Sequence, residues 1–138
     1  MSEATRWFLT RSRSGTWRSH VGLSAVLLFM CWQFSVSPAT FPISSSYAAF
    51  QAITPDESLW ALFFGATGLL GLAGAMPVLD RFYSLRVASC AILAMVHAMI
   101  GGLFWMGSPA SIGSGTFLLW GSIALGNLLW EPRECPPS

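Results

Sequence analysis

Few residues in this sequence could do chemistry, and the acidic pair Asp56–Glu57 is the most conspicuous of them. The two carboxylates lie side by side in "AITPDESLW", residues 52–60, between two strongly apolar stretches. A carboxylate pair in such surroundings could bind a cation or exchange a proton. The same two residues could instead mark the start of a helix.

The spacing around the pair favours the helix start. Thr54 is a suitable N-cap, Pro55 would occupy the first helical position, and Glu57 follows Thr54 by three residues, which is the spacing of a capping box. Both carboxylates would then lie in the first turn, where they complement the positive end of the helix dipole. We therefore predict that Thr54, Pro55, Asp56 and Glu57 cap a helix outside the membrane.

His97 is the one ionisable residue expected deep in an apolar segment. Such a residue is costly in lipid and is a functional hypothesis by default, for instance in a proton path. A neutral imidazole could instead hydrogen-bond a neighbouring helix, and Asn127 and Gln33 could act in the same way. We favour this structural role for His97, because no carboxylate is expected at its depth.

No other residues have the spacing of a catalytic or metal site. The three cysteines show no C-x-x-C pattern, and His20 is expected at the inner boundary of the membrane, at a different depth from His97. Two histidines at different depths are a poor pair of haem ligands. We predict no catalytic residue, no cofactor, no metal and no disulfide among Cys31, Cys90 and Cys135, and we expect that the protein is not an enzyme.

The elements that must position these residues follow from the composition. Of 138 residues, 54% are hydrophobic and only 9% are charged, whereas a soluble domain carries about 25% charged residues. A soluble fold of this length has too little interior to cover so much apolar surface. We expect an integral membrane protein of the all-α class, because helices satisfy their own backbone hydrogen bonds in lipid.

Four segments can each supply the roughly 20 residues needed to cross a bilayer. They cover about residues 20–37, 55–79, 85–106 and 112–130. Together they form a four-helix transmembrane domain over residues 20–130. A basic segment, residues 1–19, precedes this domain, and a short tail, residues 131–138, follows it. We expect a short periplasmic loop or interfacial helix between the first and second spans.

All seven arginines agree with one orientation of these spans. Four precede the first span, two lie between the second and third, and one follows the fourth: Arg6, Arg11, Arg13, Arg18, Arg81, Arg86 and Arg133. The positive-inside rule then places both termini in the cytoplasm. The first 19 residues could lie on the inner leaflet or form a disordered basic leader. We predict no nucleic-acid partner.

Small residues recur at helical spacings in three of the predicted spans. Such residues let helix backbones approach closely in lipid. The second span has glycines every three residues, the third has small residues every four, and the fourth has two further glycines: Gly65, Gly68, Gly71, Gly74; Cys90, Ala94, Ala98, Gly102; Gly121, Gly126. These residues could seal the four helices of one chain or could form a homo-oligomer, and we favour the first interpretation.

Four runs of the sequence carry a resemblance to a known group of proteins: "WQFSVSPATF", "SYAAFQAITPDESLWALFFGATGLLGLAGAM", "DRFYSLR" and "ALGNLLW". In these runs the chain resembles small four-span membrane proteins of tailed bacteriophages and prophages. The resemblance covers most of the chain and carries over no catalytic residue. It implies an inner-membrane protein that acts at a phage step. We expect a non-catalytic structural or interaction protein that docks to a larger membrane or phage complex. Two alternatives are a holin-like oligomeric pore and a small transporter subunit that uses His97.

Overall fold

The protein is described here from a computed structural model, which covers residues 15–36, 40–76, 83–110 and 112–134. The side chains of residues 15, 16, 43, 83, 128 and 130–134 lie outside this description. All regular structure in the described ranges is helical, as the composition predicts. Residues 1–14 of the predicted basic segment (1–19) and residues 135–138 of the predicted tail (131–138) lie outside the described residues. The remaining residues of the two segments belong to α2 and α6.

Four long helices form the body of the molecule. They are α2 (Gly15–Val36), α4 (Glu57–Gly74), α5 (Tyr83–Gly107) and α6 (Ile112–Glu134). Three of them contain segments long and apolar enough to cross a membrane, namely Trp17–Val36, Glu57–Gly74 and Ser84–Gly107, which indicates a membrane protein. The helix α6 is not among these three, so a fourth crossing remains a prediction.

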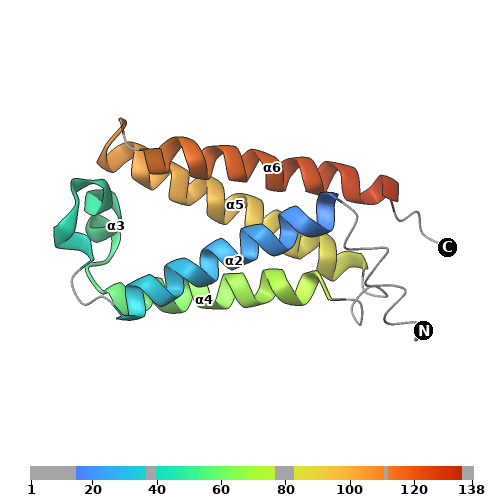
Figure 1. Ribbon diagram of the computed structural model, residues 1–138, viewed down its shortest axis with the longest axis horizontal. Coiled ribbons are helices and arrows are strands. Elements are labelled where there is room, and N and C mark those ends of the chain that lie inside the picture. Colours follow the sequence, from blue (N-terminus) through green and yellow to red (C-terminus); the bar gives the residue numbers. More distant parts are fainter. Residues whose placement is uncertain (1–14, 37–39, 77–82, 111, 135–138) are drawn as a thin grey trace.

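The four helices run roughly along one axis as two closely packed pairs (Figure 1). The helix α2 packs most extensively against α4, and α5 packs most extensively against α6. Contacts between the pairs are fewer and are made mainly by α4 with α5 and by α2 with α6. The start of α2, the end of α4, the start of α5 and the end of α6 lie at the same end of the bundle (Figure 1).

The opposite end is covered by the segment between α2 and α4. This segment contains two 3-10 turns, η1 (Phe41–Ile43) and η2 (Ser45–Tyr47), and the short helix α3 (Ala48–Ile53). A short helix between the first two long helices is what the sequence predicts. Its Phe50 is fully buried, with ring centroids 5.1 Å from both Trp60 of α4 and Phe104 of α5. Aromatic packing therefore fixes the segment to the bundle.

The outward faces of the long helices are apolar. Leu62 is 69% exposed, Met95 is 71% exposed and Leu119 is 61% exposed, and each lies on a different helix. A soluble protein rarely exposes apolar side chains so widely, whereas lipid covers them at no cost. The surface of the bundle thus agrees with the membrane class expected from the composition.

Candidate functional site

A buried polar cluster joins α2, α4 and α5 near the end of the bundle where α2 starts. His20 of α2 lies at its centre and is 7% exposed. Its Nδ1 is 3.2 Å from Cys90 Sγ, and its Nε2 is 3.4 Å from Ser89 Oγ, both on α5. The backbone of Gly71 on α4 is a further hydrogen-bond partner of the ring. One imidazole therefore links three helices.

Two serine hydroxyls complete this cluster. Ser89 Oγ donates to the carbonyl oxygen of Arg86 at 2.8 Å, and Ser24 Oγ donates to the carbonyl oxygen of His20 at 2.9 Å. Each of these polar groups is buried and has a partner, as buried polar groups normally do. Interhelical hydrogen bonds in membrane proteins contribute about 0.6 kcal/mol on average. The cluster can therefore set the relative position of the helices.

A thiol beside an imidazole is also the start of a nucleophile–base pair. Cys90 is, however, only 2% exposed, and neither Cys90 nor His20 lines the cavities between α2 and α6. A nucleophile must reach a substrate before it can act. The arrangement of this Cys–His pair fits helix packing better than catalysis.

The sequence analysis did not find the His20–Cys90 contact, although a usable signal was present. His20 lies five residues after the start of α2, and Cys90 lies seven residues after the start of α5. Both helices start at the same end of the bundle (Figure 1). Counting residues from these helix starts places His20 and Cys90 at similar depth. Only the depths of His20 and His97 were compared in the sequence, so the contact between His20 and Cys90 was missed.

The predicted small residues differ in how closely other helices approach them. A Cβ added to Gly65 would lie 2.9 Å from Cys31 Sγ of α2, and one added to Gly68 would lie 3.1 Å from the carbonyl oxygen of Ser24. At Gly71 it would meet Ser24 and Leu93 side chains together. The α4 glycines thus face α2 and, further along, α5. Gly74 continues this face, because a Cβ there would meet Ser89.

The small residues of α5 and α6 form a less uniform contact. Cys90 and Ala94 are buried, and a Cβ on Gly121 would lie 3.1 Å from the backbone nitrogen of Ala98. A Cβ on Gly102 or Gly126 would instead meet nothing within 4 Å. The last two glycines are therefore not points of close helix approach within this chain.

The helix cap at Asp56–Glu57 differs in detail from the predicted capping box. The N-cap of α4 is Asp56 rather than Thr54, and Asp56 Oδ1 accepts from the backbone N–H of Ser58 at 2.9 Å. Thr54 instead ends α3, with its N–H bonded to the carbonyl oxygen of Phe50 at 3.1 Å. Its hydroxyl accepts from the N–H of Asp56 at 3.3 Å. Because α3 ends at this point, Thr54 and exposed Pro55 lie in a connection between two helices.

The side chain of Glu57 accepts hydrogen bonds from the start of η1. Its Oε1 accepts from the backbone N–H of Phe41 at 2.8 Å, and its Oε2 accepts from the N–H of Thr40 at 3.0 Å. Both of these residues are at most 5% exposed. The carboxylate thus satisfies two donors at the start of η1, which is the usual preference of anions for helix N-termini. Both carboxylates therefore have structural roles: Asp56 caps α4, and Glu57 holds the start of η1.

Tyr47 lies between this carboxylate and the polar side chain of Gln33 on α2. Burial is the main reason that the pKa of Tyr47 is raised, and the negative charge of Glu57 raises it further. A hydrogen bond with the Gln33 side chain acts in the opposite direction. Gln33 therefore links α2 to η2. The sequence predicts a hydrogen bond from Gln33 to a neighbouring helix, and its partner lies in the connecting segment.

The side-chain amide of Asn127 links the two helix pairs. Its Nδ2 donates to Ser19 Oγ at 2.7 Å, which joins α6 to α2. Of the arginines predicted to set the topology, Arg18 is exposed and Arg86 is buried at this same end of the bundle. The others lie outside the described residues or side chains: Arg6, Arg11, Arg13, Arg81 and Arg133.

His97 lies in the core without making the interhelical hydrogen bond that was predicted for it. Its Nδ1 is 2.8 Å from the carbonyl oxygen of Leu93 on its own helix, so Nδ1 carries the proton. Its Nε2 is buried and has no hydrogen-bond partner among the described residues. The rings of Phe117 and Trp120 on α6 lie next to it, with centroids 6.0 and 6.2 Å away.

Replacing His97 with leucine should raise the free energy of unfolding by about 1 kcal/mol. The substitution removes a buried acceptor without a partner, which costs about 1–3 kcal/mol in such a site, and leaves an apolar side chain among aromatic rings. Detergent-solubilised protein can be unfolded with sodium dodecyl sulfate and followed by circular dichroism. His97→Ala serves as the control, since it should be destabilised by a cavity. A large loss of stability in the leucine variant would contradict this interpretation.

No group of three or more possible metal ligands occurs among the described residues. Within the same part of the chain, Cys31 and Cys90 are free thiols. Comparison with protein-family models, with curated proteins and with solved structures gives no match for this chain.

Proposed function

We propose that this chain is a non-catalytic structural or interaction protein that crosses the bacterial inner membrane four times and docks to a larger membrane complex. In this proposal both termini lie in the cytoplasm, and the chain is encoded by a phage or prophage. Three of the described helices contain candidate spans. The proposal takes α6, a helix of 23 residues, as the fourth crossing. The arginine distribution supports the orientation.

One observation carries the proposal: the side chains that could do chemistry are engaged in internal contacts. His20 contacts Cys90 and Ser89, and Glu57 holds two backbone N–H groups. His97 is fully buried between helices. A catalytic or transport site needs such groups to face a substrate or an aqueous path. Here the contacts of His20 and Glu57 stabilise a bundle whose exposed side chains include many large apolar ones.

The holin-like pore is less well supported. The wall of an aqueous pore needs a polar helix face, whereas the most exposed side chains of α4, α5 and α6 include Leu62, Met95 and Leu119. These residues suit lipid or the apolar helix of another protein. The burial of His97 beside the rings of Phe117 and Trp120 likewise counts against a transporter subunit based on this residue.

Inducible expression in a bacterial host tests the proposal. We expect unchanged growth and membrane potential, and we expect the tagged chain to purify in mild detergent as a larger complex of constant stoichiometry. Reporter fusions after residues 76, 110 and 134 should report inside, outside and inside. The Gly71→Leu variant, which we expect to pack poorly, controls for nonspecific retention. Abrupt loss of membrane potential on induction would instead establish the pore.

A further inference from the structure

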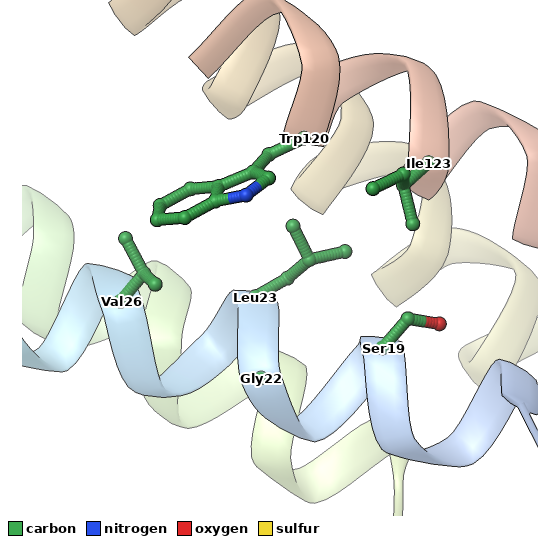
Figure 2. Close-up of a pocket in the computed structure, with 6 residues that line it drawn as sticks. All are labelled: Ser19, Gly22, Leu23, Val26, Trp120 and Ile123. Carbon is green, nitrogen blue, oxygen red and sulfur yellow. The ribbon is translucent and has the colours of Figure 1, made fainter. Parts of the chain in front are cut away.

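A lateral groove runs between α2 and α6, on the side where the two helix pairs meet. It consists of two cavities of about 270 and 410 Å³ that share Val26 and Trp120. Figure 2 shows the first cavity, with the Trp120 indole and the Ile123 side chain of α6 facing Val26 and Leu23 of α2. The second cavity continues along α2 to Gln33 and Tyr47.

The groove is apolar along its length and polar at both ends. At one end, Asn127 Nδ2 donates to Ser19 Oγ at 2.7 Å and holds α6 against α2. At the other end, the Gln33 side chain hydrogen-bonds Tyr47. Between these two links the helices are separated by the two cavities. The polar ends and the apolar middle match the profile of a bilayer.

The dimensions of the groove decide what it can hold. From Ser19 to Gln33 it follows fourteen residues of α2, which is roughly 20 Å at 1.5 Å per residue. A helix with its side chains is about 10–12 Å wide, and over that length it would need a volume on the order of 1,500 Å³. Together the two cavities provide about 680 Å³, which is less than half of that volume. This space suits one hydrocarbon chain better than a helix from a second copy.

One end of the groove carries a positive charge. Arg18 is exposed, directly precedes the lining residue Ser19 and lies about one helical turn before Gly22, so it stands next to this end of the groove without lining it. A cation at the membrane boundary attracts anionic lipid headgroups by about 1 kcal/mol. This position suits a phosphate whose acyl chain enters the groove beside Gly22.

We propose that this groove binds one acyl chain of an anionic phospholipid, which enters from the leaflet on the Arg18 side. The phosphate lies beside Arg18 and the Ser19–Asn127 hydrogen bond, and the chain extends past Leu23 toward Trp120. The bound lipid fills the space between the two helix pairs and so acts as part of the bundle. This inference rests on the membrane-spanning part of the proposed function.

Gly22→Leu tests the site because it fills the groove without disturbing the fold. A Cβ on Gly22 would meet nothing within 4 Å, so the larger side chain has room to extend into the cavity. Gly115→Leu is the matched control: Gly115 is an exposed helical glycine with equally open surroundings and lines neither cavity. Native mass spectrometry of the full chain, with phosphatidylglycerol added in mild detergent, measures the lipid retained.

We expect one tightly retained phosphatidylglycerol in the wild-type chain and in Gly115→Leu, and at least about tenfold less retention in Gly22→Leu. Arg18→Gln should reduce the preference for phosphatidylglycerol over phosphatidylcholine about fivefold, as expected for loss of about 1 kcal/mol. Equal retention in wild type and Gly22→Leu would overturn the proposal. A wild-type dimer that Gly22→Leu dissociates would also overturn it, in favour of a second copy as the occupant.

Reporter fusions on the same variants keep this test separate from that of the proposed function. If Gly22→Leu keeps the topology of the wild type but also keeps its lipid, only the groove proposal fails. If the fusions report another topology while lipid retention depends on Gly22, only the proposed four-span function fails.

Discussion

Gly71→Leu should lower the free energy of unfolding by about 3 kcal/mol or more, the largest effect that we expect from a single substitution in this chain. A Cβ at this position would meet the side chains of Ser24 on α2 and of Leu93 on α5, the latter at 3.0 Å. Gly71 therefore lies where three helices meet, and a larger side chain must push two of them away from α4. Overpacking of this kind typically costs 1–3 kcal/mol, and both neighbours are fully buried here.

The effect also reaches the polar cluster. The backbone of Gly71 is itself a partner of the His20 ring. Displacing α4 therefore removes this hydrogen bond together with packing. Unfolding in sodium dodecyl sulfate, followed by circular dichroism, measures the loss.

Gly102→Leu is the matched control for this substitution. Both glycines are helical, but a Cβ on Gly102 would meet nothing within 4 Å. Replacing glycine by leucine within a helix should by itself be neutral or stabilising, by up to about 1 kcal/mol. If the two variants lost equal stability, the close approach at Gly71 would not be the cause.

Glu57→Ala should lower the free energy of unfolding by about 2 kcal/mol, the second largest effect that we expect. Each carboxylate oxygen accepts from one backbone N–H, and the alanine would leave the donors of Thr40 and Phe41 buried without an acceptor. Hydrogen bonds to charged groups contribute about 1.5–3 kcal/mol each, and we reduce the sum because Glu57 is itself half-buried. Asp56→Ala, which removes only a helix cap, should cost about 1 kcal/mol.

The titration of Tyr47 measures whether the charge of Glu57 acts on its surroundings. In Glu57→Gln the negative charge that raises the pKa of Tyr47 is gone, so this pKa should fall relative to the wild type while burial still holds it above the usual value. Tyrosinate absorbance in a Tyr83→Phe background measures it. Because the folded state holds the phenol proton more tightly, the stabilisation is complete below the unfolded pKa of about 10 and is lost as the pH rises through the folded pKa. An unchanged titration in the glutamine variant would show that Glu57 does not act on Tyr47.

The helices were predictable because hydropathy over roughly 20 residues is a local property. Residues 85–106 and 112–130 are helical in α5 and α6, although only α5 contains a candidate span, and the expected second span begins two residues before α4. The capping box was wrong because a local rule cannot detect a competing partner. Glu57 bonds Phe41 and Thr40, which lie 16 and 17 positions earlier in the chain. The N-cap of α4 is Asp56.

Contacts between distant helices were only partly predictable. The three-residue glycine repeat of α4 identifies a face that helices can approach, but it does not say which residues fill it. The His20–Cys90 contact joins positions 70 residues apart. Likewise, the small-residue stripe of α5 does not show where α6 crosses it. Gly121 approaches Ala98, whereas Gly102 is left with open space.

The division into two helix pairs also sets the order in which the helices can associate during synthesis. Chains are synthesised from the N-terminus, so α2 and α4 can associate in the bilayer while α5 is still emerging from the ribosome. At that stage His20 has neither Cys90 nor Ser89 beside it, since both belong to α5. A nascent half-bundle of α2 and α4 therefore holds the imidazole through the backbone of Gly71 alone. The contacts with Cys90 and Ser89 form only when α5 arrives, so the polar cluster is completed late in synthesis.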